Sequence, residues 1–319
     1  MHSHYLVLLI CTAFLIGCEN ATPPQQTTPK LNKTVSSQPN SLDEYPYMEH
    51  LIAPAQLLSW QEDPQIEVIL IDVRKKEAYQ KGHLRGAHHL WRPDIRSTAF
   101  PFGGMMLEKE ALAKIMGALG ATAKSKIVLY DAKGNPDAAR LWWMLSVYGH
   151  SNTYLLNGGL LNSPKGWISQ APTPKKAAKF TFADKKRPEL EANQAEVLAA
   201  IDNDDVFLLD CRSLDEFTGK TIKDGAFRAG HIPSAVHLEY SEAIAYEHSC
   251  IFRTLKELTI RFKKIPKDKK IIVYCQSGVR SAHTTFVLRE LLGYSDVANY
   301  DGSWIEWSYH KNLPISVGL

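Results

Sequence analysis

The feature that most constrains the fold of this chain is an internal repeat. The run Ile127-Val-Leu-Tyr-Asp131 lies over Ile271-Ile-Val-Tyr-Cys275, and the same register continues without a gap to Gly158 over Gly302. The further identities in this register are Gly134 with Gly278, Ala138 with Ala282, Gly149 with Gly293 and Ser151 with Ser295. A chain that repeats itself over such a span is expected to fold as two copies of one structural unit.

A second pair of matching segments lies upstream in each copy. Ile69-Leu-Ile-Asp72-Val-Arg74 matches Leu208-Leu-Asp210-Cys-Arg212, and Gly82-His83-Leu84 matches Gly230-His231-Ile232. Between these segments the second copy carries about ten extra residues, as expected of a duplication followed by divergence. Both copies should therefore share one topology.

The hydrophobic pattern of each copy predicts an α/β fold. Short β-branched runs alternate with stretches of helical periodicity, and Ser281 to Leu292 suits a helix closed by Gly293. We expect two tandem domains, each a mostly parallel sheet flanked by helices on both faces. The expected buried strands are 68–73, 126–130, 206–209 and 270–274.

Composition shifts predict the domain boundaries. A chain of 319 residues with 45% hydrophobic and 22% charged residues is typical of a globular protein with two domains of ordinary size. The predicted parts are a signal peptide over 1–18, a flexible tether over 19–44, domains over 45–163 and 189–319, and a Pro- and Lys-rich linker over 164–188.

The first 18 residues resemble a bacterial lipoprotein signal. Their apolar run from Tyr5 to Gly17 is shorter than the roughly 20 residues that a membrane-spanning helix needs, and it ends at Cys18. We expect Cys18 to be lipidated, the alternative being an ordinary secretory signal with an incidental cysteine. Because Glu19 gives no inner-membrane retention signal, the expected location is the outer membrane, facing the periplasm.

Charge and cysteine content exclude several classes of partner. The formal net charge of +3 gives no support to nucleic-acid binding. Of five cysteines, Cys211, Cys250 and Cys275 belong to the expected domains, and no CxxC or Cys/His cluster predicts a metal site. The expected partner is a small molecule or another protein, with membrane contact only through the lipid anchor.

Cys275 is the strongest candidate for a catalytic residue. It comes directly after a predicted buried strand and before a helix, an edge of the sheet where α/β folds bind ligands. The loop Gln276, Ser277, Gly278, Val279 and Arg280 can turn backbone N–H groups inward, and the helix dipole and Arg280 add positive potential. The pKa of Cys275 should therefore be depressed. The alternative is a buried structural cysteine.

With these motifs in view, the sequence resembles the two-domain rhodanese and mercaptopyruvate sulfurtransferase family. The resemblance covers about residues 45 to 315 and rests on the repeated Asp-x-Arg and Gly-His motifs, on Cys275 to Arg280, and on Asp301-Gly-Ser-Trp304. It implies a silent first domain, with Asp131 where the second has Cys275. It also implies that Cys275 takes sulfur from a small anionic donor as a persulfide and passes it to a thiol or cyanide, with no cofactor.

Two alternative functions would also depend on Cys275. Phosphatases of the cysteine type separate their Cys and Arg by five residues, whereas four separate Cys275 from Arg280, and the shorter loop suits sulfur better than phosphate. A non-enzymatic persulfide carrier or sensor would bind a protein partner through Cys275, and only steady turnover of donor and acceptor distinguishes it from an enzyme.

Several residues are secondary candidates for supporting roles. In the mercaptopyruvate branch, positions matching Asp72 and His83 are thought to assist Ser277 across the domain interface, although a structural role in the first domain is the competing interpretation. Arg212 fits a buried ion pair, and Lys223 could bring positive charge to the donor. Cys211 is expected to be inert and Cys250 to lie in a loop; Trp142, Trp143, Trp304 and Trp307 are expected in the core or at an interface.

Glu216 departs from the family pattern and bears on the choice of donor. The family places an arginine there, and a carboxylate would repel that of mercaptopyruvate. Lys220, Lys223 and Arg228 could restore positive charge from the inserted residues. We therefore expect thiosulfate to be preferred over mercaptopyruvate, and Glu216→Arg to shift that preference toward mercaptopyruvate.

Overall fold

A computed structural model of the chain describes residues 45, 48–174, 176–182 and 186–319. The predicted signal peptide, Cys18 and the predicted tether over 19–44 lie outside the described residues. Among the helices that are described, none is both long and apolar enough to cross a bilayer.

The first repeat is built on a five-stranded sheet whose strands are all parallel, in the order β1-β6-β5-β2-β4. These strands are β1 (Leu51–Ile52), β2 (Val68–Asp72), β4 (Ala87–His89), β5 (Lys126–Tyr130) and β6 (Thr153–Leu156). The central strands β2 and β5 are almost wholly buried, as expected of a parallel sheet covered on both faces.

The second repeat forms an equivalent parallel sheet, in the order β10-β9-β13-β14-β8. Its strands are β8 (Glu191–Ala192), β9 (Val206–Asp210), β10 (Val236–His237), β13 (Lys270–Tyr274) and β14 (Val297–Tyr300). When the second order is reversed, its strands correspond one by one to those of the first sheet, with β13 in the place of β5 and β9 in the place of β2. The predicted pair of like α/β domains is therefore confirmed.

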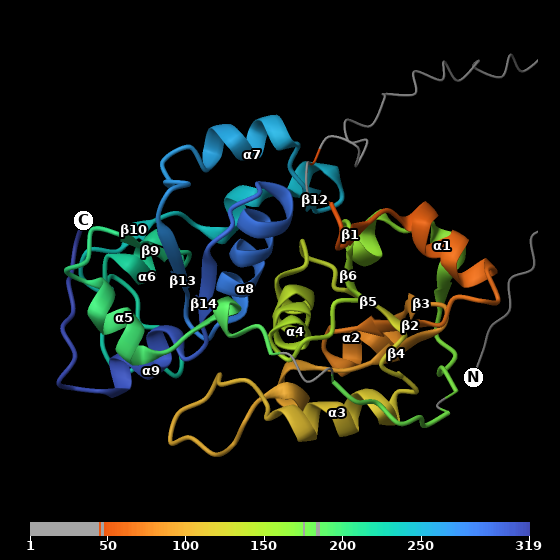
Figure 1. The fold of residues 1–319 in the computed structure, drawn as a ribbon. Helices are drawn as coiled ribbons and strands as arrows, with labels where there is room; N and C mark the ends of the chain where they lie inside the picture. Colours follow the sequence, from red (N-terminus) through yellow and green to blue (C-terminus); the bar gives the residue numbers. More distant parts are fainter. Residues whose placement is uncertain (1–44, 46–47, 175, 183–185) are drawn as a thin grey trace, which may run out of the picture. The chain divides into compact units, whose positions relative to one another are not determined.

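Helices cover both sheets (Figure 1). Those of the first repeat are α1 (Pro54–Glu62), α2 (Lys76–Lys81), α3 (Lys109–Ala118) and α4 (Pro136–Val147); those of the second are α5 (Gln194–Ala200), α6 (Leu214–Phe217), α7 (Leu255–Arg261), α8 (Val279–Phe286) and α9 (Ser303–Tyr309). The helix predicted over 281–292 begins two residues earlier because Gly278 adopts a left-handed conformation at its N-cap. Its last turn is a π-helix, η8 (Val287–Leu291).

The segment predicted as a linker, 164–188, contains structure of its own. A 3₁₀ turn, η4 (Lys165–Trp167), leads into the short strand β7 (Ile168–Ser169), which pairs antiparallel with β3 (His83–Leu84). The first part of this connection is thus packed on the first repeat, a contact that its proline and lysine content does not predict.

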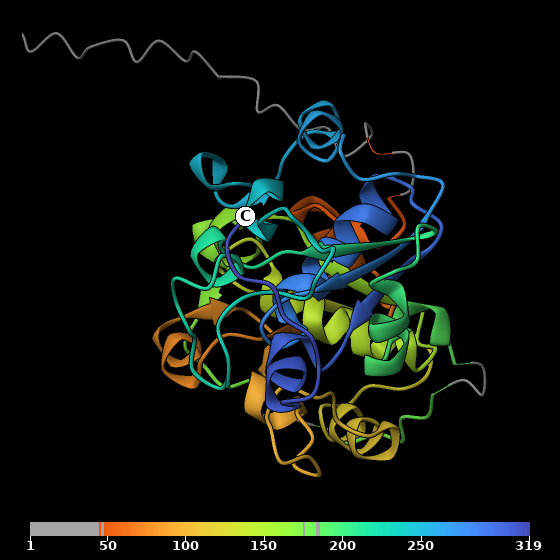
Figure 2. The same ribbon diagram turned by 90° about the vertical axis from the view of Figure 1, so that its left-hand side faces the viewer.

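The two repeats pack together through α4 and α8, which lie side by side in both views (Figures 1 and 2). Every residue of α4 is buried, and the Trp142 ring meets the Phe286 ring edge-on with centroids 4.8 Å apart. The four tryptophans expected in the core or at an interface are indeed buried. Because α4 and α8 follow directly on the loops after β5 and β13, this packing brings those two loops together.

Candidate active site

The loop from Cys275 to Arg280 connects β13 to α8 at the carboxyl edge of the second sheet. Its turn depends on Gly278, whose φ of +73° favours glycine. A Cβ at this position would come within 2.5 Å of the Arg140 guanidinium and 2.7 Å of the Asp301 carbonyl oxygen. Glycine is therefore required both by the backbone conformation and by close packing.

The matching loop of the first repeat surrounds a negatively charged side chain, Asp131. It therefore shows what kind of group a loop of this shape can hold. The Asp131 carboxylate accepts backbone N–H bonds from Lys133 at 2.8 Å, Asn135 at 2.8 Å and Asp137 at 3.1 Å. Burial and the neighbouring Asp137 raise the pKa of Asp131 to about 6, so the carboxylate is still ionised at neutral pH. The loop is thus a cradle of N–H donors for negative charge.

In the second repeat the matching N–H donors are those of Ser277, Val279 and Ser281, and Cys275 replaces the aspartate. Burial disfavours the Cys275 thiolate, but the neighbouring Cys211 thiol, the charge of Arg280 and hydrogen bonds from Ser281 together hold its pKa well below that of an ordinary thiol. The Ser281 hydroxyl lies 3.4 Å from the sulfur. The surroundings of Cys275 therefore favour the thiolate form.

The Asp301-Gly-Ser-Trp304 motif is hydrogen-bonded to the Cys275 loop. The Ser303 hydroxyl accepts the N–H groups of Cys275 at 3.2 Å and Gly278 at 3.0 Å, and donates to the Tyr300 carbonyl at 2.7 Å. The Trp304 N–H donates to the Cys275 carbonyl at 2.9 Å. These hydrogen bonds fix the backbone conformation of the loop.

Arg280 is paired with Glu216, which corrects the sequence-based argument about the donor. Two guanidinium nitrogens meet the two carboxylate oxygens at 2.7 Å each. Although burial opposes ionisation, Arg280 lowers the pKa of Glu216 to about 2. Glu216 is buried behind the loop and its charge is compensated, so it does not present a free carboxylate to a donor, and Arg280 is not a free cation.

A cavity of about 610 Å³ opens above Cys275 and is lined by both repeats. Its lining is rich in basic side chains, namely Arg92, Arg96, Lys133 and Arg140 from the first repeat and Lys223 and Arg280 from the second. The acidic residues Asp137 and Asp224 also line it. Arg280 and Arg140 are neutralised by Glu216 and Asp301, but the other four basic side chains still outnumber Asp137 and Asp224, which favours a small anion in this cavity.

Arg92 and Arg140 are functional candidates that the sequence did not reveal. Arg92 begins the 3₁₀ turn η2 (Arg92–Ile95) and donates to the Ser277 hydroxyl at 3.3 Å. Arg140 of α4 pairs with Asp301 at 2.5 Å and donates to the Gly278 carbonyl at 3.3 Å. Neither belongs to a repeated motif, so only the packing of the repeats could show that they reach the Cys275 loop.

Asp72 and His83, which the resemblance offered as helpers of Ser277, make their described bonds within the first repeat. Asp72 pairs with Arg74 at 2.6 Å, and the His83 ring contacts the carbonyls of Tyr79 at 2.9 Å and Ala171 at 3.0 Å. These contacts favour the structural interpretation, and a part in catalysis stays a prediction.

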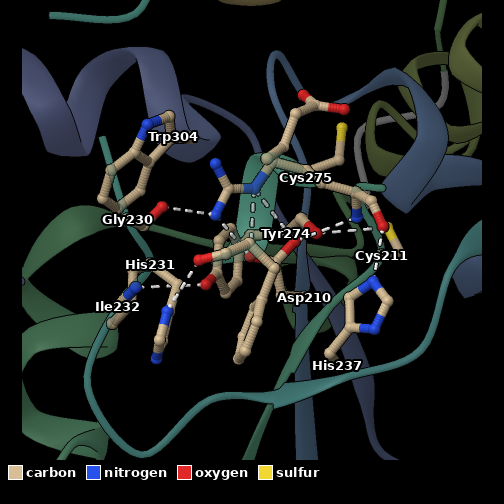
Figure 3. A network of polar contacts seen from close by, with 12 residues as sticks. Asp210, Cys211, Gly230, His231, Ile232, His237, Tyr274, Cys275 and Trp304 are labelled. Atoms are coloured by element: carbon tan, nitrogen blue, oxygen red, sulfur yellow. Dashed lines mark hydrogen bonds and ion pairs between the residues drawn. The ribbon is translucent and has the colours of Figure 1, made fainter. Parts of the chain in front are cut away.

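The same arrangement recurs around Asp210 in the second repeat (Figure 3). Arg212 is buried and pairs with Asp210 at 2.6 Å, as its sequence context suggested. Of the inserted basic residues, Lys223 lines the cavity, whereas Lys220 lies 3.8 Å from Asp215. Arg228 is used elsewhere, because it donates to carbonyls at the end of α9, including that of His310 at 2.9 Å.

The remaining cysteines differ in environment. Cys250 is half-buried, and burial together with the charge of Asp131 raises the pKa of its thiol. Cys211 is fully buried, and its thiol donates to the Tyr274 carbonyl at 3.1 Å. Within the described part of the chain, no group of three His, Cys, Asp or Glu side chains could hold a metal ion.

A thiolate held in a six-residue N–H cradle, at the carboxyl edge of a parallel sheet, defines a class of proteins that work through a nucleophilic cysteine. Rhodanese-like domains match residues 53–162 and 193–310. The chain belongs to the two-domain rhodanese family.

Proteins of known name support the same family. A thiosulfate sulfurtransferase of Corynebacterium glutamicum is 31% identical over 292 residues, covering 87% of this chain and 94% of that protein. A sulfur carrier protein of Thermus thermophilus is 30% identical over 292 residues, covering 86% and 99%.

Solved structures share the fold at lower identity. The anaerobic ergothioneine biosynthesis enzyme of Chlorobium limicola, in complex with trimethyl histidine, has a TM-score of 0.74 at 24% identity, covering 85% of this chain and 70% of that one. The crystal structure of YnjE has a TM-score of 0.74 at 22% identity, covering 86% and 70%.

Proposed function

We propose that this protein is a sulfurtransferase that moves the sulfane sulfur of thiosulfate to a thiol, or to cyanide in an assay, through a persulfide on Cys275. The observation that carries the proposal is that Cys275 begins an N–H cradle after β13 and lines a cavity rich in basic side chains, in surroundings that lower its pKa. The names of the relatives, a thiosulfate sulfurtransferase and a sulfur carrier, agree with it.

The geometry supports a cycle of two displacements. The Cys275 thiolate attacks the outer sulfur of thiosulfate, the bond between the two donor sulfurs breaks, and sulfite leaves with the electron pair. The persulfide anion then occupies the cradle, where backbone N–H groups stabilise its charge. A thiolate or cyanide attacks the outer sulfur of the persulfide and returns Cys275 to the thiolate.

Charge in the cavity is our reason to propose thiosulfate over mercaptopyruvate. Thiosulfate is a dianion, whereas mercaptopyruvate bears a single carboxylate, so each basic side chain stabilises thiosulfate about twice as strongly at equal distance. The charge of Glu216 does not affect this choice of donor, because Glu216 pairs with Arg280. An arginine at position 216 would place two like charges side by side in a buried position.

Lys223→Gln should therefore lower kcat/KM for thiosulfate by about threefold to tenfold and for mercaptopyruvate by about half as much on a logarithmic scale. Lys223 is exposed and lines the cavity, so its removal weakens attraction without leaving a buried partner unpaired. Lys220→Gln is the matched control, because Lys220 is exposed and does not line the cavity. The measurement is steady-state kinetics with both donors.

A wild-type protein that prefers mercaptopyruvate by about tenfold, with equal losses for both donors in Lys223→Gln, would contradict the assignment of the donor. A non-enzymatic persulfide carrier is the second candidate, favoured by the sulfur carrier among the relatives. It predicts one sulfur loaded per chain and no sustained turnover with cyanide.

We further propose that the protein is a lipoprotein of the outer membrane, facing the periplasm, anchored through Cys18. Cys18→Ala should move it from the membrane fraction to the soluble fraction, because the lipid attached to Cys18 would hold the protein at the membrane. Fractionation of cells that express each form measures this, with Cys250→Ala as the control. If the Cys18 variant still sediments with membranes, the lipoprotein assignment is wrong.

A further inference from the structure

The thiol of Cys211 lies beside the catalytic sulfur, on the adjacent strand. Parallel strands β9 and β13 pair Asp210 with Tyr274, and the Cys211 N–H continues the ladder by donating to the Tyr274 carbonyl at 3.0 Å. Cys211 and Cys275 are thus the next residues in register, one past the end of each strand (Figure 3).

Both cysteine side chains point to the same face of the sheet. Cys211 packs in one apolar cluster with Leu209, Val273 and Cys275, whereas Tyr274 belongs to the cluster on the opposite face. Neighbouring strands lie about 4.8 Å apart, within the range of Cα separations that a disulfide bridges. The Cys211 thiol donates to the Tyr274 carbonyl at 3.1 Å, which holds it next to the residue that precedes Cys275.

Access to the two thiols is unequal. Cys275 lines the cavity, but Cys211 is fully buried and does not line it. A donor or acceptor in the cavity therefore meets Cys275 alone, and Cys275 is the group through which Cys211 can react. Burial and the neighbouring Cys275 raise the pKa of Cys211 well above its usual range, whereas the surroundings of Cys275 lower its pKa, so Cys275 ionises first.

We propose that Cys211 is a resolving thiol, which closes a disulfide with Cys275 when Cys275 carries sulfane sulfur and so releases that sulfur as hydrosulfide. The proposal rests on the function proposed above and adds a second outlet for the persulfide. It makes the protein a thiol-dependent thiosulfate reductase in addition to a transferase.

The step balances without an outside oxidant. The Cys211 sulfur gives an electron pair to the inner sulfur of the Cys275 persulfide, and the bond between inner and outer sulfur breaks. The pair from Cys211 becomes the new disulfide bond, and the outer sulfur leaves with the electron pair of the broken bond and with the proton of Cys211, as hydrosulfide. Two external thiols then reduce the Cys211–Cys275 disulfide from the cavity side. The sum is thiosulfate plus two thiols giving sulfite, hydrogen sulfide and one disulfide.

The test loads the full-length protein in detergent with one equivalent of thiosulfate, in the absence of any acceptor. We expect sulfite first, then about one equivalent of sulfide per chain, and a final mass lower by two hydrogens with Cys211 and Cys275 joined in the peptide map. In Cys211→Ser the gain of one sulfur should persist and sulfide release should fall by about tenfold or more. Cys250→Ser is the matched control and should release sulfide like the wild type.

The outcomes separate the two proposals. If thiosulfate releases no sulfite and adds no sulfur, the proposed function fails, and inorganic polysulfide is then used to load Cys275 directly. If a loaded wild-type protein keeps its persulfide and yields neither sulfide nor the Cys211–Cys275 peptide, the resolving role of Cys211 is overturned. This wild-type result decides the matter even if Cys211→Ser does not fold.

Discussion

Replacing Cys275 with serine should reduce sulfur transfer by on the order of a thousandfold or more while the fold is retained. Serine has nearly the volume of cysteine and can still accept the cradle's N–H bonds, but its hydroxyl neither ionises at neutral pH nor forms a persulfide. Thiocyanate formation from thiosulfate and cyanide measures the loss, and circular dichroism during heating checks the fold.

The site of loading gives an independent check on the same assignment. Brief exposure of the wild type to thiosulfate, followed by alkylation and peptide mass spectrometry, should place one additional sulfur on the peptide that contains Cys275. Recovery of that sulfur on Cys250 or Cys211 as the first product would show that Cys275 is not the nucleophile. Serine at 275 should take up no sulfur at all.

Asp210→Asn should destabilise the protein by about 3–5 kcal/mol, because it leaves the buried Arg212 guanidinium without its counter-charge. The Asp210 carboxylate accepts two bonds from the Arg212 Nε at 3.0 Å and one from Nη2 at 2.6 Å, and neither side chain reaches solvent. The Arg212 guanidinium also stacks 4.6 Å from the Trp304 ring, so its movement would disturb the motif behind the Cys275 loop.

The duplication supplies the control for this prediction. Asp72→Asn removes the equivalent charge from Arg74, with the same 2.6 Å bond, but Arg74 is 13% exposed where Arg212 is 1% exposed. Since water can hydrate the Arg74 guanidinium in part, we expect a smaller loss of stability. Urea titration of both variants measures the difference, and equal shifts of the midpoint would contradict the role given to burial.

The structure makes sense of some sequence-based expectations and corrects others. Strands 126–130 and 270–274 were predicted to the residue, because a continuous β-branched run ends at a polar or reactive side chain. Glu216 was expected to repel the donor, yet its partner is Arg280, 64 positions further along the chain. The position of Cys211 beside Cys275 could not be predicted, since nothing in the sequence shows which strand lies beside its own, and its inertness stays a prediction that our proposal opposes.

The sequence alone determined the two α/β domains, and it predicted the loop that carries Cys275 and its counterpart at Asp131. These features are local, because strand periodicity, the glycine at a left-handed turn and the N–H cradle each depend on residues close together in the chain. Only the tertiary structure decided that Arg92 and Arg140 reach the loop, that Glu216 neutralises Arg280, and that Cys211 lies beside Cys275. These contacts depend on strand register and on the packing of α4 against α8, which join residues far apart in sequence and leave no periodic pattern in it.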